Sequence, residues 1–157
     1  MKIGGIQKLS LVDYPGKTCA ALFTIGCNMR CGYCHNPELV LPERYTDTIP
    51  TDDILTFLAT RVGKLEGVTI SGGEPTMHED LPDFIEKVKA LGFLIKLDSN
   101  GTNPIMLREL FARHLIDYIF ALEESLGIKH IPPPTVSSDD TDIAQPAKAE
   151  PAPEEKS

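Results

Sequence analysis

Short apolar segments alternate with amphipathic segments along the chain, and this alternation limits the possible folds more than any other feature. Four segments are short and apolar enough to be buried strands, namely residues 18–25, 67–71, 93–97 and 116–121. Three helices are expected between them, at residues 51–62, 82–91 and 103–111. Strand–helix–strand order predicts parallel strands joined by right-handed crossovers. The sequence therefore predicts an α/β fold with about four parallel β/α units. We expect Thr51 to cap the first helix and Gly92 to end the second.

Three cysteines follow the first expected strand. Cys27, Cys31 and Cys34 are spaced C-x3-C-x2-C, so their thiolates can occupy three corners of a cubic iron–sulfur cluster, which normally takes four cysteines. With no fourth cysteine nearby, one iron keeps an open position, which catalytic metal sites need and structural sites avoid. The alternative is a zinc site with His35 as fourth ligand, although zinc ligands usually come as two separated pairs. Cys19 lies within the strand and is expected to be a small buried residue rather than a ligand.

The cysteine spacing resembles the signature of the radical S-adenosylmethionine (SAM) superfamily. The resemblance implies a partial (β/α) barrel and a 4Fe-4S cluster on the three cysteines, whose open iron binds the amino and carboxylate groups of SAM. Tyr33, just before the third cysteine, would lay its backbone against the adenine. Residues 71–75 (SGGEP) look like the motif for the methionine amino group, and residues 97–102 (LDSNGT) look like the segment that holds the ribose and the carboxylate. The SAM-binding residues implied in these two segments are Gly72, Gly73, Glu74, Asp98, Ser99 and Asn100.

Each of these residues also has a plain structural explanation. The two glycines can simply make a tight turn. Glu74 can be a solvated loop acid, and Asp98 and Asn100 can be caps or turn formers. Their position directly after buried strands favours SAM contact, because parallel α/β folds carry their chemistry at the carboxyl ends of the strands.

The segments around the cysteine loop indicate a subfamily. Residues 5–17 (GIQKLSLVDYPGK) and 35–39 (HNPEL) look like those of the glycyl-radical-enzyme activases, in particular the activases of anaerobic ribonucleoside-triphosphate reductase. The resemblance covers residues 1–119. It implies reductive cleavage of SAM, an electron from a cytoplasmic one-electron donor, and abstraction of a hydrogen atom from a glycine of the partner enzyme. Two alternatives stay open: a radical SAM enzyme acting on a small molecule, as in nucleoside biosynthesis, and a truncated remnant that binds a cluster or a partner without catalysis.

Charge and composition indicate the cellular compartment and the kinds of partner that are excluded. A net charge of −8 over 157 residues argues against nonspecific binding to nucleic acid. No apolar run is long enough for a membrane span or a signal peptide, and the clustered cysteines suit a reducing compartment, so we expect a cytoplasmic protein. Residues 131–157 carry six acidic residues against two lysines and are rich in proline and alanine. We expect them to be a disordered tail that follows a radical SAM core at residues 1–130.

The carboxyl-terminal part of the core departs from the resemblance. Activases of this kind usually build six β/α units, whereas this chain supplies about four. The Asp-Ile-Lys segment that would follow Ile119 has no clear match, although Glu123 can substitute for its aspartate. We therefore expect a truncated or divergent barrel whose last strand is an unprotected edge, with a tendency to self-associate or to require a partner.

Overall fold

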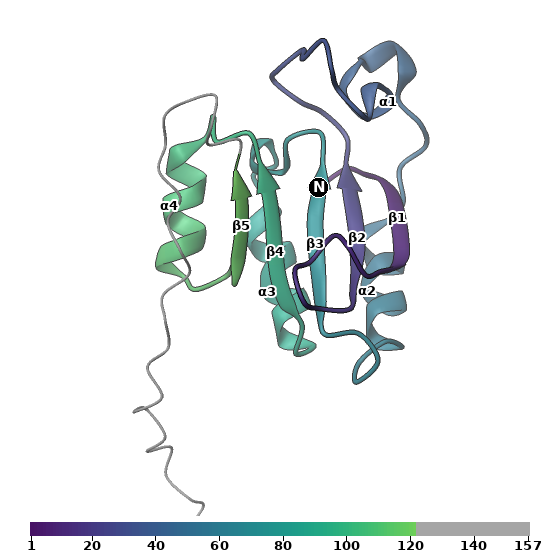
Figure 1. The fold of residues 1–157 in the computed structure, drawn as a ribbon, viewed down its shortest axis with the longest axis vertical. Coiled ribbons are helices and arrows are strands. Elements are labelled where there is room, and N and C mark those ends of the chain that lie inside the picture. The colour runs from purple at the N-terminus through teal and green to yellow at the C-terminus, as the bar shows by residue number, and fades with distance from the viewer. Residues whose placement is uncertain (122–157) are drawn as a thin grey trace, which may run out of the picture.

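A five-stranded sheet organises the protein. The computed structural model describes residues 1–121, so the expected tail at 131–157 and the end of the expected core at 1–130 lie outside the described residues. The strands are β1 (Ile3–Ser10), β2 (Cys19–Thr24), β3 (Gly67–Gly72), β4 (Leu94–Ser99) and β5 (Tyr118–Ala121). They follow one another across the sheet in chain order (Figure 1). Strands β2 to β5 are parallel, which confirms the predicted fold class of four parallel β/α units.

Among the strands of residues 1–121, β1 is the one that the sequence pattern did not predict. It pairs antiparallel with β2, with Ile6 opposite Leu22. Its apolar signal is weak because it contains two glycines and polar residues, and only Ile3 and Ser10 are buried along it. Gly4 serves a packing purpose, because a Cβ atom there would lie 2.6 Å from Cγ1 of Ile25. The sheet thus begins with an antiparallel edge strand that a pattern of buried parallel strands cannot reveal.

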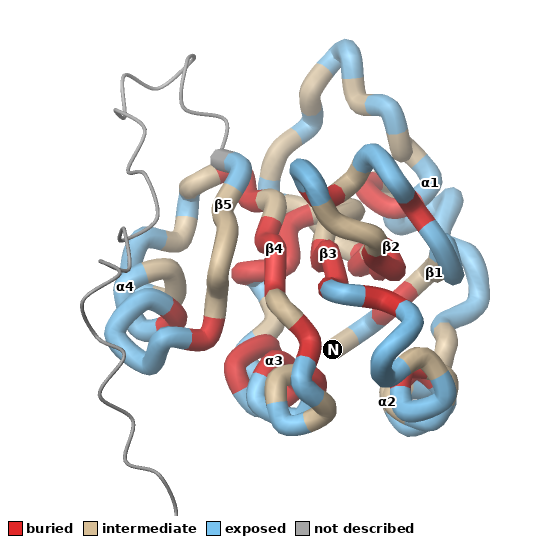
Figure 2. The backbone as a smooth tube through the Cα atoms, turned by 60° about the horizontal axis from the view of Figure 1, so that its bottom comes forward, coloured by how far each residue is buried: buried red, intermediate tan, exposed pale blue. Residues whose placement is uncertain are grey.

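The longer helices are α2 (Thr51–Ala59), α3 (Leu81–Ala90) and α4 (Pro104–Ala112), and a short helix α1 (Pro37–Val40) follows the cysteine loop. Figure 2 shows α2, α3 and α4 in one layer on the same side of the sheet. The core lies between these layers and includes the fully buried residues Leu22, Ile70, Leu97, Leu58, Ile85 and Leu110. Each such side chain stabilises the fold by about 1.5–3 kcal/mol relative to exposure.

The helix ends agree in part with the sequence. Asn103 caps α4 by accepting a hydrogen bond from the backbone N–H of Met106 at 3.2 Å. Gly92 follows the end of α3 with φ +91°, as expected for a residue in the left-handed region. The expected cap at Thr51 is wrong, because Thr51 is already the first residue of α2 and Pro50 holds the capping position. Proline has no side-chain acceptor, so this helix begins without a side-chain cap.

All four parallel strands end at the same edge of the sheet, where the cysteine loop also lies (Figure 1). The loop between β1 and β2 crosses the face of the sheet opposite the helices. There the carbonyl oxygen of Asp13 accepts from Thr69 Oγ1 at 3.1 Å, and the rings of Tyr14 and Tyr118 lie 6.0 Å apart. This loop closes the amino-terminal end of that face and leaves the carboxyl-terminal end open for a site.

Candidate functional site

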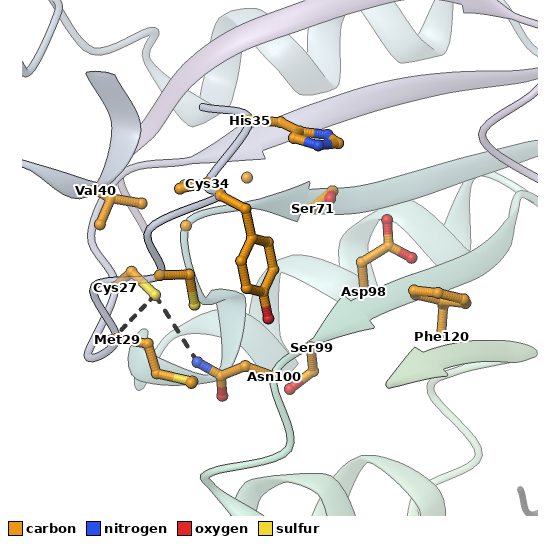
Figure 3. A pocket seen from close by; sticks show the side chains of 14 residues that line it. Cys27, Met29, Cys34, His35, Val40, Ser71, Asp98, Ser99, Asn100 and Phe120 are labelled. Atoms are coloured by element: carbon orange, nitrogen blue, oxygen red, sulfur yellow. Dashed lines mark hydrogen bonds between the residues drawn. The ribbon is translucent and has the colours of Figure 1, made fainter. Parts of the chain in front are cut away.

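The three predicted motifs meet around one cavity. It has a volume of about 390 Å³ and lies at the carboxyl ends of β2, β3 and β4 (Figure 3). Of the ten residues predicted from the sequence, nine line this cavity: Cys27, Cys31, Tyr33, Cys34, Gly72, Gly73, Asp98, Ser99 and Asn100. The tenth, Glu74, is buried beneath the loops and does not line the cavity. Segments that lie more than seventy residues apart in the sequence thus form a single site.

The cysteine loop presents three free, partly exposed thiols. The backbone N–H of Cys34 donates to the carbonyl of Cys31 at 3.1 Å, which closes the second half of the loop as a turn. The sulfur of Cys27 accepts from the backbone N–H of Met29 at 3.4 Å and from Nδ2 of Asn100 at 3.8 Å (Figure 3). Hydrogen bonds to a metal-binding side chain orient it and adjust its basicity. Cys27 therefore already carries the supporting bonds that a ligand needs.

The donor set of the site, three free and partly exposed thiols, suits an iron–sulfur cluster. Within residues 1–121, no three histidine, cysteine or acidic side chains converge on one point. A zinc ion requires such convergence, because each sulfur must lie about 2.3 Å from the same metal. In a cluster, each cysteine binds a different iron, so the sulfurs surround a volume instead of meeting at a point. His35 also lines the cavity, and the choice between a cluster and a zinc site remains a prediction that metal uptake tests.

The packing of neighbouring backbone segments requires glycine at both position 72 and position 73. A Cβ atom on Gly72, whose φ is +109°, would lie 2.3 Å from the backbone nitrogen of Thr24. A Cβ atom on Gly73 would lie 2.0 Å from the carbonyl oxygen of Gly26. The exit of β3 therefore packs directly against the exit of β2, which carries the cysteine loop. The sequence suggested SAM contact or a tight turn for these glycines, and close contact between two backbone segments gives a further reason for them.

Glu74 has an environment that the sequence did not predict. Its side chain is fully buried, so the explanation as a solvated loop acid is wrong. Its carboxylate accepts hydrogen bonds from the backbone N–H and the hydroxyl of Thr76, at 3.1 and 2.5 Å. It also accepts from Oγ of Ser99 at 2.8 Å and from the backbone N–H of Asn100 at 2.6 Å. Glu74 thus joins the exit loop of β3 to the exit loop of β4.

The exit of β4 contains a charged pair that sequence reasoning missed. The ammonium group of Lys96 is buried and forms an ion pair with Asp98, and it also lies 5.8 Å from the ring centre of Phe120. Lys96 precedes Asp98 by two residues in a strand, so both side chains must project from the same face. The two-residue repeat of a strand was the sequence signal that could have revealed this pair. Asp98 and Phe120 both line the cavity, so one of its walls is charged and aromatic.

Three further residues clarify the boundaries of the site. Cys19 is fully buried in β2, where burial raises the pKa of its thiol, which confirms its predicted role as a buried residue. Tyr33 is 72% exposed at the mouth of the cavity. His78 is partly buried outside the cavity, and this burial lowers the pKa of its imidazole.

These features define a class of site: three cysteines, a glycine turn and a polar strand end, gathered at the carboxyl edge of a parallel β/α sheet. Residues 22–125 match the family described as the Radical SAM superfamily, which is more than half of the chain. The chain belongs to the radical SAM superfamily. Membership implies that SAM and an iron–sulfur cluster are its cofactors. Among residues 1–121, no helix has both the length and the apolarity to cross a membrane.

Several curated proteins are similar to this chain. A putative glycyl-radical enzyme activating enzyme of Methanocaldococcus jannaschii is 39% identical over 120 residues, which cover 74% of this chain and 48% of the relative. A probable GTP 3',8-cyclase of Pyrococcus horikoshii is 31% identical over 102 residues, or 64% of this chain and 32% of the relative. A pyruvate formate-lyase-activating enzyme of Listeria monocytogenes is 26% identical over 184 residues, or 92% of this chain and 73% of the relative. The chain spans about half the length of the first of these relatives.

Proposed function

We propose that this chain is a radical SAM activase that forms a glycyl radical on anaerobic ribonucleoside-triphosphate reductase. The observation that carries the proposal is the single cavity into which the cysteine loop and the exits of β3 and β4 all open. Two of the similar proteins are named as activating enzymes, which supports the activase class. The choice of partner rests on the resemblance of residues 5–17 and 35–39 to activases of that reductase.

Each motif has a separate task in this proposal. Cys27, Cys31 and Cys34 would hold a 4Fe-4S cluster and leave one iron open. The cluster, once bound and reduced by a cytoplasmic one-electron donor, supplies the electron that breaks a carbon–sulfur bond of SAM, and the protein provides binding and orientation. Residues 72–73 and 98–100 line the cavity where the methionine and ribose parts of SAM would bind.

The remaining wall of the cavity faces the substrate in this proposal. Ser71 and Phe120 lie beside Asp98, on the side of the cavity away from Cys27 (Figure 3). A glycine-bearing loop of the partner would enter along this wall, because the cysteines and the glycine turn occupy the opposite side. Tyr33, exposed at the mouth, would restrict the access of water to the reacting atoms.

A second candidate function has one observation in its favour. The similarity to a probable GTP 3',8-cyclase suits a radical SAM enzyme that acts directly on a small molecule. Both functions use the same cofactors and the same cavity, so the two differ in the nature of the substrate alone. The third alternative, a remnant without catalysis, predicts cofactor binding without SAM cleavage.

Anaerobic reconstitution of the full chain tests the cluster. We expect about four irons per chain, as a cubic cluster requires. Cys31→Ala should lose most of this iron. Cys19→Ala is the matched control and should retain it, since Cys19 is buried in β2 away from the cavity. Tight zinc binding without iron uptake would contradict the proposal.

A turnover assay tests the activity. The reconstituted chain is mixed with SAM, a one-electron reductant and anaerobic ribonucleoside-triphosphate reductase, and the glycyl radical is followed by electron paramagnetic resonance. We expect a signal that depends on SAM and disappears when the radical-bearing glycine of the partner is replaced by alanine. SAM cleavage without this signal favours the small-molecule enzyme. No cleavage at all, from a chain with full iron content, favours the remnant.

A further inference from the structure

We infer that Asn100 is a positioning residue that donates a hydrogen bond to the sulfur of Cys27 and raises the reduction potential of the cluster, and that Glu74 holds Asn100 in place for this purpose. The inference rests on the proposed function only in that a cluster must bind to Cys27. Glu74 is thereby assigned to the protein's own loops rather than to SAM.

The orientation of the Asn100 side-chain amide is determined by its neighbours. Its Oδ1 accepts from the backbone N–H of Thr102 at 3.0 Å and from the hydroxyl of Thr102 at 2.6 Å. Because both donors require an oxygen, the amide nitrogen must occupy the other side. That nitrogen donates to the sulfur of Cys27 at 3.8 Å and to Oδ1 of Asn28 at 2.9 Å. The donor aimed at the sulfur is therefore fixed by hydrogen-bond chemistry.

A closed ring of three side chains supports this orientation. Asn100 donates to Asn28, the amide nitrogen of Asn28 donates to Oγ1 of Thr102 at 2.7 Å, and Thr102 donates back to Asn100. Asn28 belongs to the cysteine loop, whereas the other two residues belong to the exit of β4. The ring thus attaches the cysteine loop to that strand, and turning the Asn100 amide would break bonds to both partners.

Glu74 sets the backbone position of Asn100. The backbone N–H of Asn100 donates to Oε2 of Glu74 at 2.6 Å, and Oγ of Ser99 donates to Oε1 at 2.8 Å. With two further bonds from Thr76, four donors from the chain surround a fully buried carboxylate. A buried carboxylate is tolerated only with such partners. Removing any of these donors should therefore cost considerable free energy. Glu74 is fully buried and does not line the cavity, which supports a role within the loops rather than contact with SAM.

The physical effect on the cluster has a defined sign. Reduction adds one negative charge, part of which resides on the cysteine sulfurs. An N–H group aimed at a sulfur stabilises the reduced form more than the oxidised form, because hydrogen bonds to charged acceptors strengthen with the charge. Hydrogen bonds to the sulfurs are among the determinants of cluster potential. Loss of the Asn100 donor should therefore lower the midpoint potential.

The test uses the full chain, reconstituted anaerobically, with iron content and the midpoint potential as readouts. The potential is measured by redox titration, following the paramagnetic signal of the reduced cluster. Asn100→Ala should retain iron and shift the midpoint to a more negative value. Asn100→Asp should shift it further in the same direction, since a carboxylate places negative charge near the sulfur and donates no bond.

Asn103→Ala is the matched control, because it removes an asparagine three residues along that caps α4 and does not contact the sulfur. It should lower the stability of the fold and leave the midpoint unchanged. A midpoint that is the same in Asn100→Ala as in the wild type overturns the inference. A general effect of loop destabilisation would instead shift the midpoint in Asn103→Ala as well, and this too would overturn it.

Glu74→Gln separates the two roles of the glutamate. Its amide cannot accept all four bonds, so we expect a potential shifted in the same direction as in Asn100→Ala. Loss of SAM binding with an unchanged potential would instead make Glu74 a SAM ligand and refute its assignment here. If Glu74→Gln fails to fold, Thr102→Val removes the hydroxyl that bonds to Asn100 and Asn28 but keeps the backbone N–H of residue 102. It loosens the Asn100 amide without freeing it, and should lower the potential by a smaller amount. A wild-type chain that takes up no cluster refutes the proposed function itself, whereas an unshifted potential refutes this inference alone.

Discussion

Gly73→Ala tests whether the site is built by direct packing of two backbone segments. The added methyl group would lie 2.0 Å from the carbonyl oxygen of Gly26 and 2.7 Å from its carbonyl carbon. Ordinary contacts of a Cβ atom begin at 3.4 Å, so the two loops must separate by more than about 1 Å. The same carbonyl accepts the backbone N–H of Glu74 at 2.7 Å, and this hydrogen bond would be lost or lengthened.

The expected cost follows from these two effects. Overpacking in a close-packed region costs about 1–3 kcal/mol, and the loss of one hydrogen bond adds about 1 kcal/mol. We therefore expect the free energy of unfolding to fall by about 2–4 kcal/mol, a large part of the 5–15 kcal/mol that is usual for a domain. With an m-value of about 1.5 kcal/mol per molar, the urea midpoint should fall by about 1–3 M. Iron uptake should fall too, because the displaced segment carries Cys27.

Gly32→Ala is the control for this experiment. Gly32 lies within the cysteine loop, and a Cβ atom there would meet nothing within 4 Å. This substitution should change the free energy of unfolding by less than about 0.5 kcal/mol and leave iron content near that of the wild type. If the two alanine variants unfold at the same urea concentration, the close packing of the two loops is not a determinant of the fold, and the reasoning fails.

Two other predictions concern buried charge. Lys96→Met should destabilise the fold by about 1–3 kcal/mol in urea unfolding, because it leaves Asp98 without its partner. The double variant Lys96→Met/Asp98→Leu should recover part of this loss. A larger loss in the double variant would contradict the pairing. Burial lowers the pKa of His78, so the unfolded chain binds this proton more tightly than the folded chain does. Stability of the cluster-free chain should therefore be lost as the pH falls below about 6.5, the ordinary histidine pKa. His78→Gln should reduce this loss, and an unaltered pH profile would show that the imidazole is not desolvated.

Much of the architecture could be predicted because it depends on local patterns. Buried strands such as residues 67–71 are continuous apolar runs, and their alternation with amphipathic helices permits few topologies. The location of the motifs at one edge follows from the same rule, since parallel strands end on the same side. Strand β1 was not predictable in this way, because its glycines and exposed polar residues reflect packing against Ile25 and the edge of the sheet rather than an apolar run.

The sequence by itself determined the candidate ligands and their neighbourhood. Cys27, Cys31 and Cys34 lie close together because few residues separate them along the chain, and the strand pattern predicts the other motifs beside them. Only the tertiary structure decided what the remaining residues contact. From the sequence, Glu74 could be a loop acid, whereas in the structure its buried carboxylate joins Ser99 and Asn100. From the sequence, Gly73 could be a turn residue, whereas in the structure the backbone of Gly26 leaves no room for a Cβ atom there. The physical reason is that hydrogen bonding and close packing act between atoms that are near in space, whereas a sequence pattern reports only on neighbours along the chain.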